Sequence, residues 1–314
     1  MHTVTQYFND LSATLGAAWN RFWFAPTSAT TLGVLRIATG LLALYTIATY
    51  APDLERWFAE DGMLPMSLIR DLYRPEGQLL GQRSLLDHLP DAMLWPAYWT
   101  SLAVLALYTL GVGGRAIVIA ATVVTISFFT RGPLLIGELE HVLAMLMIYL
   151  CIGRACDAFT ILSLWKGKNT GPPSPFRIPN SAFNTISLRL IQIHVAIIHL
   201  MMAGAQLAAP ESAWWSGEGV WLAIARPGMS LVDLNGLIDH PRIIAAWSHA
   251  ITLYLLAFPV LVWKRLARPL VLVIGACVWT SFAIASGYVP FCLAMLTGLA
   301  AFSKPRRATT VAAG

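Results

Sequence analysis

Residues Leu188–Trp221 read LRLIQIHVAIIHLMMAGAQLAAPESAWWSGEGVW, and this stretch decides the fold of the chain. Its first part is apolar enough for a membrane helix, which needs about 20 residues, and its end is a loop rich in tryptophan. At about 100° per residue, a strip roughly 100° wide holds four polar residues of the helix. They are Arg189, Gln192, His199 and Gln206.

The polar strip has two interpretations. Polar side chains at membrane depth face other helices or a wet cavity, because an unpaired polar group in hydrocarbon costs several kcal/mol. Gln192, His199 and Gln206 therefore either form interhelical hydrogen bonds or form one wall of a substrate site. His194 falls outside the strip, at about 140° from Arg189.

Composition indicates an all-α, polytopic membrane helical bundle. Hydrophobic residues make up 57% of the chain and charged residues 12%, against about 25% charged residues in soluble proteins. Residues 28–302 are predicted to form one domain of about eight transmembrane helices. The expected helices are 30–50, 92–112, 116–130, 138–154, 181–207, 242–263, 269–286 and 289–302.

The two ends of the chain are expected outside the bilayer core. Residues 1–27 carry apolar side chains at helical spacing among polar ones, which predicts an amphipathic helix at the membrane interface. Residues 303–314 are predicted to be a disordered cytoplasmic tail. The polar segment 51–91 is expected to form surface helices and no span.

Charge predicts the orientation in the membrane. Basic residues gather at the helix ends that share a side with both termini, whereas acidic residues gather in the loops 51–91 and 208–241. An excess of basic residues marks the cytoplasmic side of a membrane protein. Both termini are therefore expected in the cytoplasm, and the expected location is the inner membrane of the cell. Membrane lipid is the expected partner. Nucleic acid is not, because basic runs with interleaved aromatics are missing.

Two arginines lie inside predicted spans, each about two turns from a cytoplasmic end. They are Arg36 and Arg189, and Asp157 is the acidic residue nearest to them in this topology. Buried charges need partners. The three residues are therefore predicted to form a structural charge cluster.

A second group of polar residues lies at the outer face. Glu138 and His141 are three residues apart at the start of a helix and can touch. They either contribute to a site or form a hydrated helix start. Trp214 and Trp215 either cover an outer cavity and bind substrate there, or belong to the belt of aromatic residues at the membrane–water interface. Neither these residues nor the four cysteines have metal-ligand spacing, so no metal site is predicted.

The chain resembles the vitamin K-dependent γ-carboxylase-like proteins, also called the HTTM (horizontally transferred transmembrane) family. The resemblance covers roughly residues 30–302. Its residues are TLGVLRIATGL at 31–41, ELEHVLAMLMIYLCIGRACD at 138–157, the stretch 188–221, and the helix pair 268–302. It implies that His141 occupies the position of a functional histidine. The residues themselves name no cofactor, and the resemblance allows a reduced quinone.

One departure from the family affects the expected chemistry. In the carboxylases a lysine follows the Ala-Gly pair, whereas here Gln206 follows Ala203-Gly204-Ala205. A desolvated lysine can act as a base and a glutamine cannot. Gln206 at this position therefore argues against classical glutamate carboxylation. His199 becomes the best remaining proton acceptor, with Glu138, His141 and Gln206 as the other candidate catalytic residues.

The leading hypothesis is a membrane-embedded modifying enzyme that acts on a peptide or lipid-like substrate at the outer face. The alternatives are a transporter, a lipid-binding membrane protein, or a partner subunit of a secreted-peptide maturation system. A transporter would favour matching halves with Gly/Pro-broken helices, and the sequence has no internal repeat.

Overall fold

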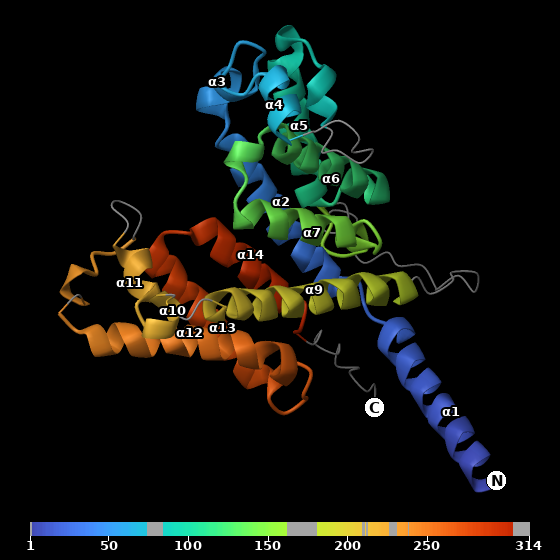
Figure 1. The fold of residues 1–314 in the computed structure, drawn as a ribbon. Helices are drawn as coiled ribbons and strands as arrows, with labels where there is room; N and C mark the ends of the chain where they lie inside the picture. The colour runs from blue at the N-terminus through green and yellow to red at the C-terminus, as the bar shows by residue number, and fades with distance from the viewer. Residues whose placement is uncertain are drawn as a thin grey trace, which may run out of the picture. The chain divides into compact units, whose positions relative to one another are not determined.

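The chain folds into helices. The computed structural model describes residues 2–73, 84–161, 181–208, 211, 213–225, 231–237 and 239–303. Throughout these ranges the regular structure is α-helix and 3-10 helix, without strands (Figure 1). The predicted all-α class is therefore confirmed.

Within the residues that the structure describes, six helical segments are long and apolar enough to cross a membrane, which makes the chain an integral membrane protein. They are Thr30–Phe58, Asp91–Leu110, Gly114–Arg131, Ala182–Leu207, Pro241–Leu261 and Arg268–Ser286. Two further predicted spans are shorter helices, α7 (Glu138–Leu150, 13 residues) and α14 (Val289–Ala300, 12 residues). A straight span needs about 20 residues. The predicted total of eight transmembrane helices therefore depends on whether α7 and α14 cross the membrane.

Contacts divide the chain into two compact units. Within the described residues, unit 1 comprises the segments up to Ile136 and from Ala144 to Leu190, and unit 2 comprises Gly137–Leu143 and the segments from Ile191 to residue 303.

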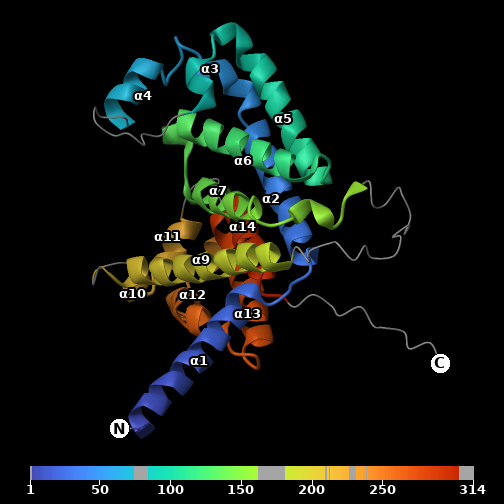
Figure 2. The same ribbon diagram turned by 90° about the vertical axis from the view of Figure 1, so that its right-hand side faces the viewer.

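The core of unit 1 forms where α2 (Thr30–Ala48) packs along α5 (Leu94–Leu110), which in turn packs on α6 (Gly114–Arg131) (Figure 2). The hydroxyl oxygens of Thr39 on α2 and Tyr108 on α5 are 2.8 Å apart and fully buried. This hydrogen bond satisfies two polar groups that hydrocarbon could not.

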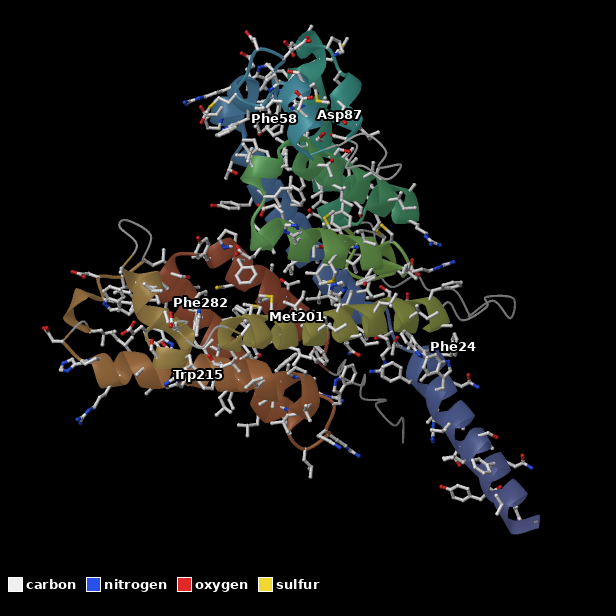
Figure 3. The ribbon with its side chains drawn as sticks, in the orientation of Figure 1. Phe24, Phe58, Asp87, Met201, Trp215 and Phe282 are labelled. Atoms are coloured by element: carbon white, nitrogen blue, oxygen red, sulfur yellow. The ribbon has the colours of Figure 1, made fainter. Side chains whose placement is uncertain are left out.

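The polar segment after α2 forms short helices, as predicted. They are η1 (Ala51–Asp53), α3 (Leu54–Phe58), α4 (Met66–Tyr73), η2 (Leu85–His88) and η3 (Asp91–Met93). Phe58, labelled in Figure 3, anchors α3. Its ring packs edge-on against Phe128 of α6, with 5.6 Å between the centroids. At η2, the Asp87 carboxylate accepts a hydrogen bond from the Ser84 backbone N–H.

The start of the chain is one helix, α1 (His2–Phe24). Its apolar side chains stay exposed, as at Phe8 (61%) and Trp19 (62%). The helix matches the predicted one, and its location at a bilayer surface stays a prediction. The predicted tail lies outside the described residues, except for Ser303.

Unit 2 is built on the second part of α9 (Ser181–Leu207), with α12 (Pro241–Leu261), α13 (Arg268–Ser286) and α14. Two short helices, α10 (Ala213–Ser216) and α11 (Gly219–Ile224), pack against α12. Three polar residues of α9, Gln192, His199 and Gln206, contact α12 or the residue after α14.

Candidate functional site

His199 is fully buried on α9, with none of its surface exposed. Its Nδ1 atom lies 2.7 Å from the carbonyl oxygen of Val195, one turn earlier. A carbonyl only accepts hydrogen bonds, so Nδ1 carries the proton and Nε2 keeps its lone pair. Nε2 lies 3.5 Å from the hydroxyl oxygen of Tyr254 on α12.

Aromatic rings enclose this imidazole. Phe258 stacks on it with ring centroids 4.0 Å apart, and Trp279 of α13 meets it edge-on at 5.7 Å. The Trp279 indole is 2% exposed. Its N–H makes no hydrogen bond within the described residues. The site therefore combines one acceptor, one hydroxyl and one N–H group inside an apolar wall.

The two glutamines of the polar strip bind neighbouring helices. Gln206 accepts a hydrogen bond from the Thr252 hydroxyl on α12 at 2.8 Å. Gln192 donates to the carbonyl oxygen of Ala301, just after α14, at 2.7 Å. These contacts fit the helix–helix interpretation of the strip for both glutamines, whereas His199 keeps an acceptor nitrogen that faces only a hydroxyl.

The predicted residues at the start of α7 are on the surface. Glu138 and His141 are both exposed, and the His141 Nδ1 atom lies 2.7 Å from the Gly137 carbonyl oxygen. The carboxylate that packs inward is that of Glu140, which accepts from the Gly137 N–H at 2.7 Å. Within the described ranges, no hydrogen bond, ion pair or ring contact joins Glu138 or His141 to His199, so their catalytic role stays a prediction.

The tryptophan loop contains a pocket, although the two predicted tryptophans do not line it. Trp214 packs against Phe282 of α13, with centroids 6.5 Å apart, and Trp215 is 59% exposed on α10 (Figure 3). Trp221 lines the pocket, whose volume is about 570 Å³, together with Glu218 and Arg242.

Arg36 is fully buried and binds backbone atoms in place of the expected carboxylate. Its guanidinium donates to three carbonyl oxygens, those of Ala155 (3.0 Å), Ala158 (3.2 Å) and Phe159 (2.7 Å). A guanidinium has five N–H donors in a planar fork, so the carbonyls of one loop can satisfy most of it. Burial raises the pKa of the adjacent Cys156 thiol, and the Arg36 charge opposes that increase.

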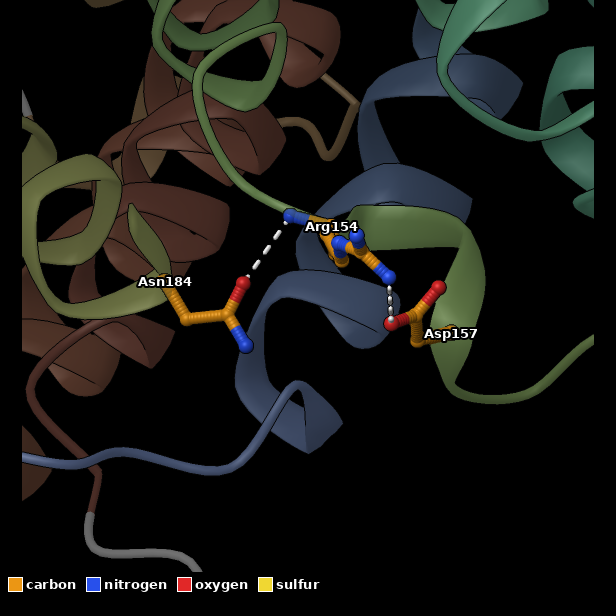
Figure 4. A network of polar contacts seen from close by, with 3 residues as sticks. All are labelled: Arg154, Asp157 and Asn184. Carbon is orange, nitrogen blue, oxygen red and sulfur yellow. Dashed lines mark hydrogen bonds and ion pairs between the residues drawn. The ribbon is translucent and has the colours of Figure 1, made fainter. Parts of the chain in front are cut away.

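The predicted charge cluster of Arg36, Arg189 and Asp157 is replaced by other contacts. Asp157 pairs with Arg154 at 3.7 Å, and both side chains are about half exposed. The Arg154 backbone N–H donates to the Asn184 side chain at 2.9 Å (Figure 4). Arg189 donates to the Phe22 carbonyl oxygen at 3.0 Å and covers the Phe22 ring. Carbonyls and an aromatic ring thus take the place of the carboxylate.

Sequence reasoning missed Tyr254 and Trp279 as neighbours of His199. Each is an aromatic residue in an apolar helix, which is typical of a packed core. The helical wheel of α9 gives the direction of His199 but cannot show which helix faces it. Sequence reasoning also did not single out Arg131 at the end of α6, which is 2% exposed.

Comparison with known proteins leaves the family resemblance as an expectation. No protein-family model, curated protein or solved structure matches the chain. Among the residues that the structure describes, no group of three or more His, Cys, Asp or Glu side chains could hold a metal ion.

Proposed function

We propose that this chain is a membrane-embedded modifying enzyme of the γ-carboxylase-like kind that acts on a peptide or lipid-like substrate without classical glutamate carboxylation. The observation that carries the proposal is the buried His199 imidazole. Its Nε2 lone pair faces the Tyr254 hydroxyl at 3.5 Å inside an aromatic wall. The family resemblance sets the class of reaction, and Gln206 at the lysine position argues against the classical one.

In this proposal, the Nε2 lone pair of His199 accepts a proton from a substrate hydroxyl or acidic C–H group. The Val195 carbonyl holds Nδ1–H, which fixes the tautomer that leaves the Nε2 lone pair available. Tyr254 can donate a hydrogen bond to the charge that develops on the substrate. The family resemblance allows a reduced quinone, whose hydroxyl could donate to Nε2. When bound, it would supply reducing equivalents.

His199→Phe tests the proposed activity, with His194→Phe as the matched control on the same helix. Membranes from cells that express each form are compared with wild type by mass spectrometry of their peptides and lipids. We expect a mass change with wild type and His194→Phe that is lost with His199→Phe. Phenylalanine keeps the ring that stacks on Phe258 and removes the acceptor, so folding is retained.

A peptide or lipid change that persists at full level in His199→Phe would contradict the proposed role of the imidazole. The absence of any change attributable to the wild-type chain would contradict the enzyme assignment itself. Thermal melting of the three purified forms checks that they are equally folded.

The orientation in the membrane is part of the same proposal: eight spans that include α7 and α14, both termini in the cytoplasm, and the inner membrane as location. Ser216 is exposed and lines the same pocket as Pro241, at the beginning of α12. Leu266, 92% exposed, follows the end of α12. The basic residues Lys264 and Arg265 lie beside it, and positive charge favours the cytoplasm.

Cysteine labelling tests this orientation in a background without the four native cysteines. We expect Ser216→Cys to react with an impermeant thiol reagent in intact cells. Leu266→Cys should react only after the membrane is permeabilised. The opposite labelling pattern would invert the topology, and labelling of both positions in intact cells would show that α12 does not cross the membrane.

A further inference from the structure

The pocket in unit 2 lies at one end of a membrane-crossing helix. Its lining comes from the connection between α10 and α11 (Ser216, Gly217 and Glu218), from Trp221 of α11, and from the first residues of α12 (Pro241 and Arg242). Since α12 is long and apolar enough to span a bilayer, its end lies where lipid headgroups meet the hydrocarbon.

The walls of the pocket are fixed by two contacts. Gly217 has φ +91°, and a Cβ atom there would lie 2.7 Å from the Cβ of Ala245 on α12. Only glycine lets the connection lie this close to the helix. The Val220 N–H donates to the hydroxyl oxygen of Ser248 at 3.0 Å, and Ser248 is fully buried. Gly217 in the connection and Val220 of α11 thus both contact α12.

The pocket carries one charge of each sign. Glu218 and Arg242 both line it, and both are exposed. In the described part of the chain, neither side chain makes an ion pair or a hydrogen bond with a protein group. Two opposite charges that line one cavity without pairing suit a ligand that carries both charges.

Beyond Arg242, the same side of α12 is exposed. At about 100° per residue, five exposed residues fall within roughly 40° of the direction of Arg242. Ala246 and His249 lie nearer the pocket, and the apolar residues Leu253 (67% exposed), Leu256 (40%) and Val260 (62%) follow them. A ligand whose charged end lies in the pocket can therefore place acyl chains along the same side of the helix.

We propose that this pocket binds the headgroup of a phospholipid with a primary ammonium group, of the phosphatidylethanolamine type. Arg242 donates hydrogen bonds to the phosphate, Glu218 accepts from the ammonium, and Trp221 covers the headgroup. Hydrogen bonds between charged groups are the strong ones. A choline headgroup has no N–H to donate to Glu218, and a glycerol headgroup has no positive charge.

Lipid binding to the full chain tests the proposal. Purified protein in detergent is titrated with phosphatidylethanolamine, phosphatidylcholine or phosphatidylglycerol, and native mass spectrometry counts the bound lipid. We expect the ethanolamine lipid to bind about tenfold more tightly than the others, which corresponds to one hydrogen bond between charged groups. Arg242→Gln should weaken its binding by about tenfold, and Glu218→Gln should reduce it to the choline level.

Matched controls separate the pocket from general charge effects. Arg265→Gln and Glu211→Gln remove exposed charges of the same sign in unit 2, and binding should stay at the wild-type level. Ser216→Trp should weaken binding by filling the pocket while both charges remain. Equal binding of the three lipids, or unchanged binding in Arg242→Gln and Glu218→Gln, would overturn the proposal.

A water-soluble headgroup distinguishes a lipid from a free metabolite. Glycerophosphoethanolamine has the same charges and no acyl chains, so we expect it to compete poorly with the lipid. Competition at equal concentration would overturn the lipid assignment. Because the pocket does not include His199, these results stand apart from those on the proposed enzyme activity.

Discussion

Replacing Arg36 with methionine is expected to lower the free energy of unfolding by about 4 kcal/mol, since the buried carbonyl oxygens that it satisfies are left without a donor. Those oxygens belong to Ala155, Ala158 and Phe159, and the arginine itself is fully buried. Methionine preserves the length of the side chain without a donor. Reversible unfolding of the purified chain in mixed micelles measures the change.

The exposed ion pair beside this loop provides the control. Asp157→Asn and Arg154→Met each remove one member of a half-exposed pair, and exposed pairs contribute little to stability. Both variants should therefore melt close to wild type. Equal losses in Asp157→Asn and Arg36→Met would mean that the carboxylate, and not the set of carbonyls, compensates the buried charge.

Replacing Arg131 with methionine is expected to cost about 3 kcal/mol, because two charge-assisted hydrogen bonds are lost. The guanidinium of Arg131, 2% exposed, donates to the carbonyl oxygens of Phe58 and Leu64, each at 2.8 Å. These oxygens belong to α3 and the loop after it. The loss should therefore be local, and hydrogen exchange in residues 54–73 should accelerate more than in α5 or α6.

Arg56→Met is the matched control, because Arg56 lies in the same segment, is 66% exposed and pairs only with Asp53 among the described residues. Its exchange pattern should resemble that of wild type. Uniform acceleration throughout unit 1 in Arg131→Met would contradict a local role and assign the arginine to the general core of the unit.

The sequence predicted where charges lie in the fold better than it predicted their partners. The position of Arg36 within an apolar run indicated a buried charge that needs compensation. Its partners are backbone carbonyls more than a hundred residues away, and every residue has a carbonyl, so no side-chain pattern marks them. The same limit explains why Asp157 was chosen as the partner.

For the candidate site too, the sequence predicted the position of a residue better than its contacts. Helical periodicity placed His199 on the polar strip of α9, and the imidazole is buried there. Periodicity describes one helix at a time, however, and Tyr254 and Trp279 come from two others. At the start of α7, spacing allowed a contact between Glu138 and His141. The His141 Nδ1 atom instead lies 2.7 Å from the Gly137 carbonyl oxygen, and a backbone contact of this kind leaves no side-chain pattern in the sequence.

The Arg36 contacts also bear on how the chain is made. The nearest of its carbonyl partners follows 119 residues later in the sequence. At about 5–20 residues per second, a ribosome needs roughly 6–24 seconds to synthesise that interval. During this time the first span holds a charge without its final partners. A chain truncated before residue 155 lacks these carbonyl oxygens, so the charge in its first span stays without them.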